Sequence, residues 1–302
     1  MKLRETQLDI LRLAAFAGVI FTHAREGSFG TLPSLLAAVV TWHVPVFVML
    51  SGRFFLDPER PCPPRKLLRA IARLGTAWLF WNTLYQLYYL LTGMYAGLNR
   101  NGLLVQWLLG TYHLWFLPML MCLYAAVPLL RRLAEGKRRT EIYLLLFLLF
   151  GFLAQEKGRT VFSIALGFSG YFVLGDYLRR HPLTDRREAA LYTAGILCMI
   201  LTGTAALRSG PGEEWFCRYL MPNVILEAAA ICTLFSRRVP GFPSRRITVL
   251  AQCSFGGYLV HPFVLAWLDP IPLPLRVMLT FVLSLAIAGI LRKIPRLGKW
   301  IA

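Results

Sequence analysis

Charged residues are scarce in this chain of 302 residues, at 16% of the sequence, and only fifteen of them are acidic. Beside 57% apolar residues, so little charge excludes an ordinary soluble domain, in which about 25% of residues are charged. The six cysteines show neither paired extracellular spacing nor a metal-binding pattern, and we assign them no function. Internal repeats are absent, and no soluble stretch is long enough for a catalytic domain. We therefore expect one domain, residues 1–302, that performs its chemistry within a lipid bilayer.

Long apolar runs are abundant in the sequence. A helix needs roughly 20 apolar residues to cross the hydrocarbon core, and we find ten such runs, at 8–25, 33–56, 67–92, 113–131, 141–155, 160–178, 189–207, 219–236, 247–268 and 273–294. The runs are continuous and lack the alternation of a barrel, so they predict an all-α, polytopic membrane helix bundle of about ten transmembrane helices. The fifth run is short and the stretch 93–112 is half polar, which leaves counts of nine and eleven open. The first run lacks a small-residue cleavage site, so we interpret it as a retained helix.

Lysine and arginine number 33 and give the chain a net charge of +18. If the N-terminus lies inside, 23 of them flank the inner ends of the runs, Lys2 and Arg4 among them, and seven, including Lys157 and Arg159, lie outside. Basic residues favour the cytoplasmic side of a membrane, so we expect a multi-pass protein of the cell membrane with both termini cytoplasmic. The charge then reflects topology and contact with the anionic lipid bilayer, which argues against nucleic acid as a partner.

Ionisable residues within the runs are functional candidates, because a bilayer disfavours charge that is neither paired nor hydrated. Arg12 and His23 lie eleven residues apart in the first run. On one helix they share a face and stand roughly 16 Å apart along the axis. The stripe thus joins a fixed cation to an imidazole that titrates near neutral pH. The alternative is that Arg12 pairs with Asp9, one turn earlier, while His23 only caps the helix.

Other histidines are expected at a similar depth in the outer half of the bundle. His113 opens the fourth run, His261 precedes Pro262 in the ninth, and His43 lies slightly deeper. For each of these three, an interhelical hydrogen bond is the structural alternative. A metal site is not favoured, because the sequence has no His-x-x-x-His pair and few carboxylates at that depth. We expect Glu227, in the eighth run, to be paired structurally, with a partner that the sequence does not identify.

Five motifs follow one another along the chain. They are Leu8-Asp9-x-x-Arg12 followed after ten intervening residues by His23, Val44-Pro45-Val46-Phe47-Val48-Met49-Leu50-Ser51-Gly52, His113-Leu114-Trp115-Phe116, Tyr171-Phe172-x-x-Gly175 and Ser254-Phe255-x-x-Tyr258-Leu259-x-His261-Pro262. In this order, on ten runs, they resemble the acyltransferase 3 family of integral-membrane acyltransferases, in the stand-alone form without a fused extracellular domain. The chain departs from the family pattern at Arg53, where an aromatic residue is usual, and at Ala77, where proline is usual.

The resemblance implies transfer of an acyl group, most often acetyl, from cytoplasmic acyl-CoA to a hydroxyl or amine. The acceptor would be a cell-envelope glycan, a glycolipid or lipid-linked sugar, or a small molecule. The donor, acetyl-CoA or another acyl-CoA, would have its phosphates bound at a cytoplasmic mouth by Arg12, Arg69 and Arg73. No metal cofactor is expected.

The resemblance also assigns roles at the other end of the stripe. His23 would act as general base on the acceptor or as a transient acyl carrier. His113 and His261 are further catalytic candidates that, with Trp115 and Tyr258, would position the acceptor or stabilise the thioester oxyanion. The rival class is a multi-span transporter or flippase without covalent chemistry, for which we find no repeat symmetry between the two halves of the sequence.

Overall fold

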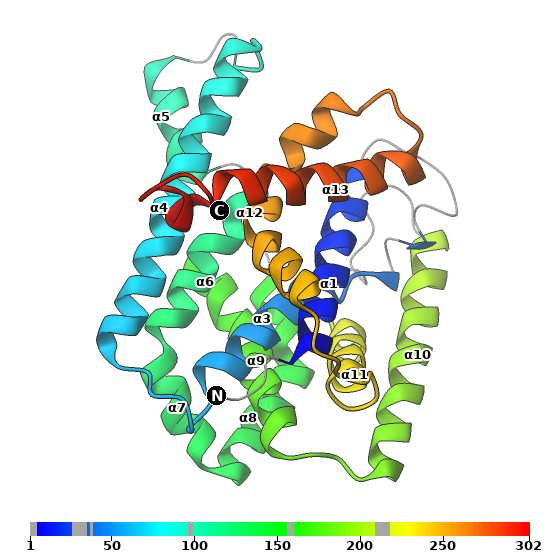
Figure 1. The fold of residues 1–302 in the computed structure, drawn as a ribbon. Helices are drawn as coiled ribbons and strands as arrows, with labels where there is room; N and C mark the ends of the chain where they lie inside the picture. Colours follow the sequence, from blue (N-terminus) through cyan, green and yellow to red (C-terminus); the bar gives the residue numbers. More distant parts are fainter. Residues whose placement is uncertain are drawn as a thin grey trace.

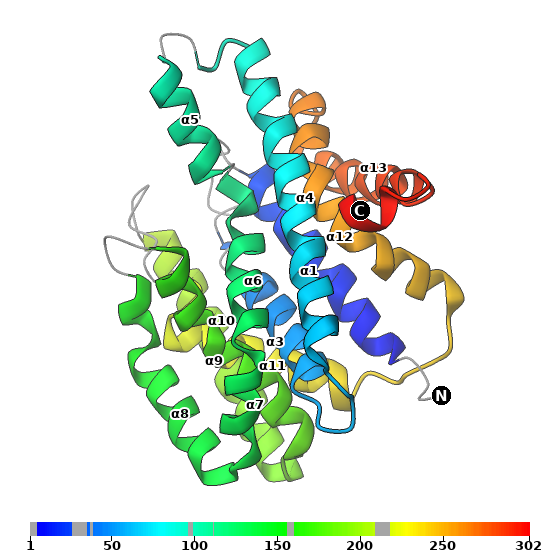
Figure 2. The same ribbon diagram turned by 90° about the vertical axis from the view of Figure 1, so that its left-hand side faces the viewer.

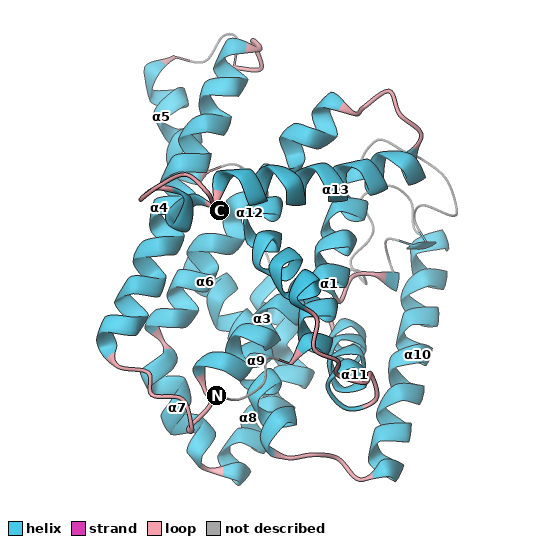
Figure 3. Cartoon of the chain, in the orientation of Figure 1, coloured by secondary structure: helices cyan, strands magenta, loops and turns pink. Residues whose placement is uncertain are grey.

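The computed structural model describes residues 5–25, 35–36, 39–95, 99–110, 112–155, 160–208 and 218–302. This part of the chain is helical and has no strand, so the predicted all-α fold is confirmed (Figures 1 and 3). Each of the ten predicted runs contains helix. The helices are α1 (Thr6–Ala24), α3 (His43–Phe55), α4 (Pro64–Leu91), α5 (Arg100–Leu109), η1 (Tyr112–Trp115), α6 (Phe116–Ala125), α7 (Val127–Glu135), α8 (Lys137–Phe150), η2 (Gly151–Gln155), α9 (Val161–Arg180), α10 (Asp185–Arg208), α11 (Pro222–Arg237), α12 (Arg245–Trp267), α13 (Leu273–Leu291) and α14 (Gly298–Ile301).

Five of the described helices are long and apolar enough to cross a membrane, namely α1, α9, α10, α12 and α13. Helices α6 and α7, bent by 59° at their junction, make a sixth candidate if they count as one broken span. Figures 1 and 2 show that α13 runs across the long axis of α4 rather than beside it. These two helices therefore do not both lie along one membrane normal. A count of about ten spans and the cytoplasmic location of the termini stay predictions.

Peripheral helices turn apolar side chains outward. Helix α10 exposes more than half of Ile196 and Leu201, and α13 exposes more than half of Met278 and Val282. A soluble monomer seldom shows such large apolar faces, whereas lipid tails accept them without cost. The outer surfaces of α10 and α13 thus suit contact with lipid.

The centre of the bundle depends on a close crossing of α3 and α9 at two glycines. A Cβ added at Gly52 would lie 1.8 Å from the carbonyl oxygen of Phe172, and one at Gly175 would lie 2.1 Å from that of Met49. Only glycine permits the two backbones to approach so closely. The glycines that end the second and fourth motifs therefore hold the same contact from opposite sides.

We expect Gly52→Ala to lower the thermal midpoint of the purified protein clearly, because forcing a methyl group into packed backbone costs about 1–3 kcal/mol. The matched control is Gly75→Ala in α4, where the nearest atom to an added Cβ is the Met121 sulfur at 3.6 Å, an ordinary contact. Thermal unfolding in detergent measures both. Equal midpoints for the two variants would show that α3 and α9 can separate at no cost.

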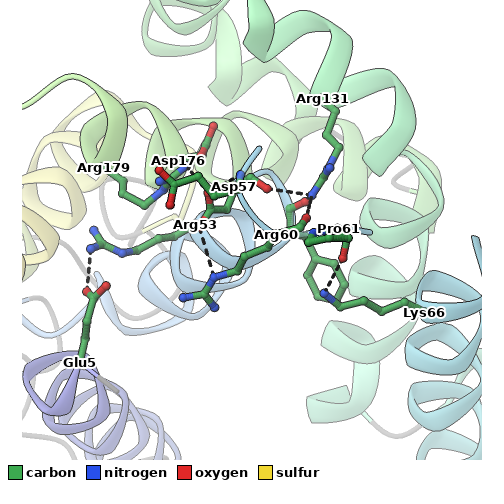
Figure 4. A network of polar contacts seen from close by, with 11 residues as sticks. Glu5, Arg53, Asp57, Arg60, Pro61, Lys66, Arg131, Asp176 and Arg179 are labelled. Carbon is green, nitrogen blue, oxygen red and sulfur yellow. Dashed lines mark hydrogen bonds and ion pairs between the residues drawn. The ribbon is translucent and has the colours of Figure 1, made fainter. Parts of the chain in front are cut away.

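Basic residues from the connection between α3 and α4, from α7 and from the end of α9 meet around Asp57 (Figure 4). Asp57, just after α3, lies 3.3 Å from Arg179 at the end of α9 and 3.2 Å from Arg60. Arg131 of α7 donates to the carbonyl oxygens of Phe55, Asp57 and Arg60 at 2.8–3.0 Å. Three of the segments that the charge pattern predicts on one side of the membrane are therefore neighbours in space. Lys2, Arg4, Lys157 and Arg159 lie outside the described residues.

Charge asymmetry further predicts that the connections near residues 60, 136, 184 and 241 are cytoplasmic. Thr184 is exposed between α9 and α10 and suits a test. A cysteine at that position should react with an impermeant maleimide in opened cells but not in intact cells. Labelling of Thr184→Cys from outside intact cells would reverse the topology.

Candidate active site

Helix α1 carries Arg12 and His23 on one unbroken segment of 19 residues. Eleven residues of helix separate them by roughly 16 Å along the axis. Between them, Gly18 lets α1 rest on the start of α3, since a Cβ at Gly18 would lie 3.0 Å from the Cβ of His43. The helix therefore connects two distinct polar regions of the bundle.

One region is a histidine cluster, formed by His23, His113 and His261. The ring centroids of His23 and His261 are 5.3 Å apart, and those of His113 and His261 are 5.7 Å apart. The three rings come from α1, η1 and α12. The first, third and fifth motifs thus converge on one point.

Tyrosine side chains fix the histidine cluster. The Tyr258 hydroxyl donates a hydrogen bond to the carbonyl oxygen of His113, and the Tyr85 ring lies 4.7 Å from the His113 ring. The Tyr85 hydroxyl in turn donates to the carbonyl oxygen of Leu259 at 2.9 Å. Tyr258 is therefore a positioning residue whose hydroxyl hydrogen is already used.

His261 has a defined tautomer. Its Nδ1 lies 2.6 Å from the carbonyl oxygen of Tyr258, and because a carbonyl only accepts, Nδ1 carries the proton. Its Nε2 is buried and has no hydrogen-bond partner within the described chain. In the neutral ring this nitrogen is an acceptor, available to the hydroxyl or amine hydrogen of a bound molecule.

Exposure distinguishes the members of the histidine cluster. His113 and His261 are fully buried, whereas His23 is half-buried. His23 also interacts electrostatically with both of the other rings. A substrate that enters from the surface can therefore reach His23 first.

The second region is an arginine cluster, formed by Arg12, Arg73 and Arg292. Arg12 and Arg73 both act electrostatically on Tyr124 of α6, which also interacts with the Ser51 side chain. Arg292, just after α13, lies near enough to Arg73 for their charges to repel. Helices α1 and α4 thus bring positive charge to Tyr124, and the end of α13 adds a further cation near Arg73.

Carboxylates only partly compensate the arginine cluster. Arg12 lies 3.8 Å from Asp9, so the intrahelical pair considered as an alternative does occur in the structure. Arg73 and Arg292 form no ion pair with a carboxylate among the described residues. Arg69 is exposed one turn before Arg73 on α4, so it shares the same side of that helix. The cluster therefore retains positive charge suited to an anion.

Trp115 lies apart from the histidine cluster. Its ring packs 5.6 Å from Phe168 and 6.2 Å from Tyr219, and the Tyr219 hydroxyl lies 3.5 Å from Nε2 of His43. Trp115 thus borders the side of the site where His43 lies.

Two residues left unassigned by the sequence have clear partners. Arg53, the departure from the family pattern, pairs with Glu5 at 2.7 Å (Figure 4). Glu227 accepts a hydrogen bond from Thr202 at 2.7 Å and contacts no cation among the described residues. Both side chains therefore serve the packing of the bundle. Arg53 does so through its ion pair with Glu5, and Glu227 does so through the hydrogen bond that it accepts from the neutral hydroxyl of Thr202.

Sequence reasoning missed four residues at the two clusters, namely Ser51, Tyr85, Tyr124 and Arg292. Ser51 belongs to the second of the five motifs, and this position was a usable signal. Tyr85 and Tyr124 carried no signal, because an aromatic residue in an apolar run is ordinary core. Among the described residues, no group of three or more His, Cys, Asp or Glu side chains is arranged to hold a metal ion.

Comparison with known proteins yields one match. A protein-family model described as an acyltransferase domain matches residues 5–293, nearly the whole chain. No curated protein and no solved structure matches the chain. The matched region contains both clusters.

Proposed function

We infer that this chain, which belongs to the acyltransferase 3 family and is thus a membrane acyltransferase, transfers an acetyl group from acetyl-CoA to an acceptor of the cell envelope. The family match confirms the resemblance drawn from the five motifs, and it favours an enzyme over a transporter. Acetyl-CoA, a hydroxyl or amine acceptor, the cytoplasmic membrane and the histidine chemistry are our proposals.

One observation carries this proposal: a single helix joins the arginine cluster to the histidine cluster. The roughly 16 Å between Arg12 and His23 along α1 is comparable with an extended pantetheine arm. A donor whose phosphates lie at the arginines would therefore place its thioester beside His23. Neither cluster alone points to a donor of this length.

At the arginine cluster, the phosphates of the donor would supply the negative charge that the nearby carboxylates only partly provide. Guanidinium groups bind phosphate by charge-assisted, partly bidentate hydrogen bonds, which are stronger than neutral ones. Arg12 and Arg73 both act electrostatically on Tyr124, and the exposed Arg69 extends the positive surface along α4. This arrangement suits the several phosphate groups of coenzyme A.

At the histidine cluster, unprotonated His23 would take the proton of the acceptor hydroxyl while the oxygen of that hydroxyl bonds to the thioester carbon. The carbon–sulfur bond then breaks, and the coenzyme A thiolate takes up that proton as it leaves. The acceptor nitrogen of His261 suits orientation of the acceptor, and His113 suits hydrogen bonding to the oxyanion. Transient acylation of His23 is the other route that the same residue supports.

Membranes that contain the protein should incorporate label from acetyl-CoA with a radioactive acetyl group. Fractionation into lipids, glycans and small metabolites then identifies the acceptor class. Membranes with an equal amount of the Thr184→Cys protein, altered away from both clusters, should incorporate as much label. Absence of any labelled product above protein-free membranes would contradict the proposed function.

A further inference from the structure

The last five described residues lie beside the arginine cluster, and three of them, Gly298, Ile301 and Ala302, are buried. Ile301 and Ala302 are each 1% exposed. The Trp81 indole nitrogen donates to the carbonyl oxygen of Ile301 at 2.8 Å, and a Cβ at Gly256 would lie 2.9 Å from that of Ala302. Figures 1 and 2 show this end of the chain next to α4 and α12. We call residues 298–302 the tail.

The path of the tail is fixed by an unusual turn. After α13 the chain reverses at Arg296, whose φ of 64° lies in the left-handed region that L-residues seldom adopt. Gly298 then packs against the end of α13, where an added Cβ would lie 2.3 Å from the carbonyl oxygen of Leu291. Such a conformation persists when the surrounding contacts hold it in place.

The tail contacts Arg73 directly. One guanidinium nitrogen of Arg73 donates to the carbonyl oxygen of Ala302 at 3.1 Å, and its Cζ lies 5.0 Å from the centre of the Phe255 ring. An arginine side chain has several rotatable bonds and loses entropy whenever it is fixed. These two contacts define its position.

We propose that the tail is a positioning element of the donor site, which holds Arg73 ready for the phosphates of the acyl donor. This inference rests on the proposed function. A preset arginine binds more tightly because the cost of ordering it is met during folding rather than on binding. Trp81 is then a positioning residue that acts through the backbone of Ile301.

Titration of the purified protein in detergent with coenzyme A, followed by calorimetry, tests the proposal. A chain ending at Leu297 should bind coenzyme A about tenfold more weakly, a change equivalent to roughly 1.4 kcal/mol. Trp81→Phe, which keeps the ring but removes the donor to Ile301, should weaken binding in the same direction. The control is Trp267→Ala, because Trp267 lies at the end of α12, outside the tail, with its side chain exposed, and its affinity should equal that of the original chain.

Thermal midpoints and kinetics separate positioning from loss of fold. Weaker binding by Trp81→Phe, with an unchanged midpoint and a raised KM for acetyl-CoA at constant kcat, supports the inference. If the chain ending at Leu297 and Trp81→Phe both bind coenzyme A as tightly as the original chain, or more tightly, the inference is overturned. If Arg73→Ala weakens binding in that case, the proposed donor site stands without the tail. If the original chain binds no coenzyme A, the proposed function fails and the inference fails with it.

Discussion

His23→Ala should insert and fold yet lose nearly all acyl transfer, a fall of about 10²–10⁴-fold, the usual contribution of a general base. His23 is the one half-buried member of the histidine cluster. Its removal leaves only the two buried rings, which are not the ones that an acceptor entering from the surface reaches first. Release of labelled product from acetyl-CoA measures the loss. Purified variants should be compared at equal protein and with their thermal midpoints.

His23→Gln separates proton transfer from hydrogen bonding, because an amide keeps a hydrogen bond but takes no proton at neutral pH. The matched control is His181→Gln, at the end of α9 and outside both clusters. His181→Gln should retain full turnover. More than about a tenth of normal turnover in His23→Gln would make His23 an orienting residue, since loss of a base costs at least 10²-fold.

Arg12→Ala should weaken acetyl-CoA binding about 10- to 100-fold, because a hydrogen bond to a charged group contributes about 1.5–3 kcal/mol. The side chain of Arg12 is 37% exposed, so its loss leaves no buried cavity. Asp9 would lose its partner at 3.8 Å and retain the hydrogen bond from Thr248 at 3.3 Å. Isothermal titration with acetyl-CoA and the KM for acetyl-CoA both measure the effect.

The control for Arg12→Ala is Arg65→Ala, which removes an exposed cation in the first turn of α4. If the donor responds only to the general positive charge of the protein, the two variants should weaken binding equally, and raised salt should abolish both effects. An unchanged affinity in folded Arg12→Ala would remove Arg12 from the donor site. Arg73→Ala and Arg69→Ala should show smaller losses in the same direction.

Much of the fold was predictable because apolar runs determine where helices form in lipid. The runs at 160–178 and 273–294 correspond to α9 at Val161–Arg180 and α13 at Leu273–Leu291. The bend between α6 and α7 was not predicted within the run 113–131, although Pro128 in the first turn of α7 marks it. The undecided stretch 93–112 contains α5, whose N-cap residue Asn99 accepts a hydrogen bond from the backbone nitrogen of Gly102.

The candidate site was predictable only for residues whose predicted depth in the membrane indicates which side chains lie close together. His23, His113 and His261 were predicted at similar depths in three runs, and the ring of His261 lies close to both of the others. The arginine cluster depends on which helices pack together and on a tail that has no apolar run of its own. Periodicity contains no information on either, so Arg292 and Tyr124 could not be assigned from the sequence.

The contact of α1 with His43 at Gly18 has a mechanical consequence. Gly18 stands ~9 Å along the helix from Arg12 and ~8 Å from His23, so the contact lies close to the midpoint between the two clusters. A rigid helix that tilts about this point moves its ends by similar distances in opposite directions. If donor binding tilted α1 about this point, the affinity for the acceptor would change, and by thermodynamic linkage the acceptor would alter donor binding by the same factor.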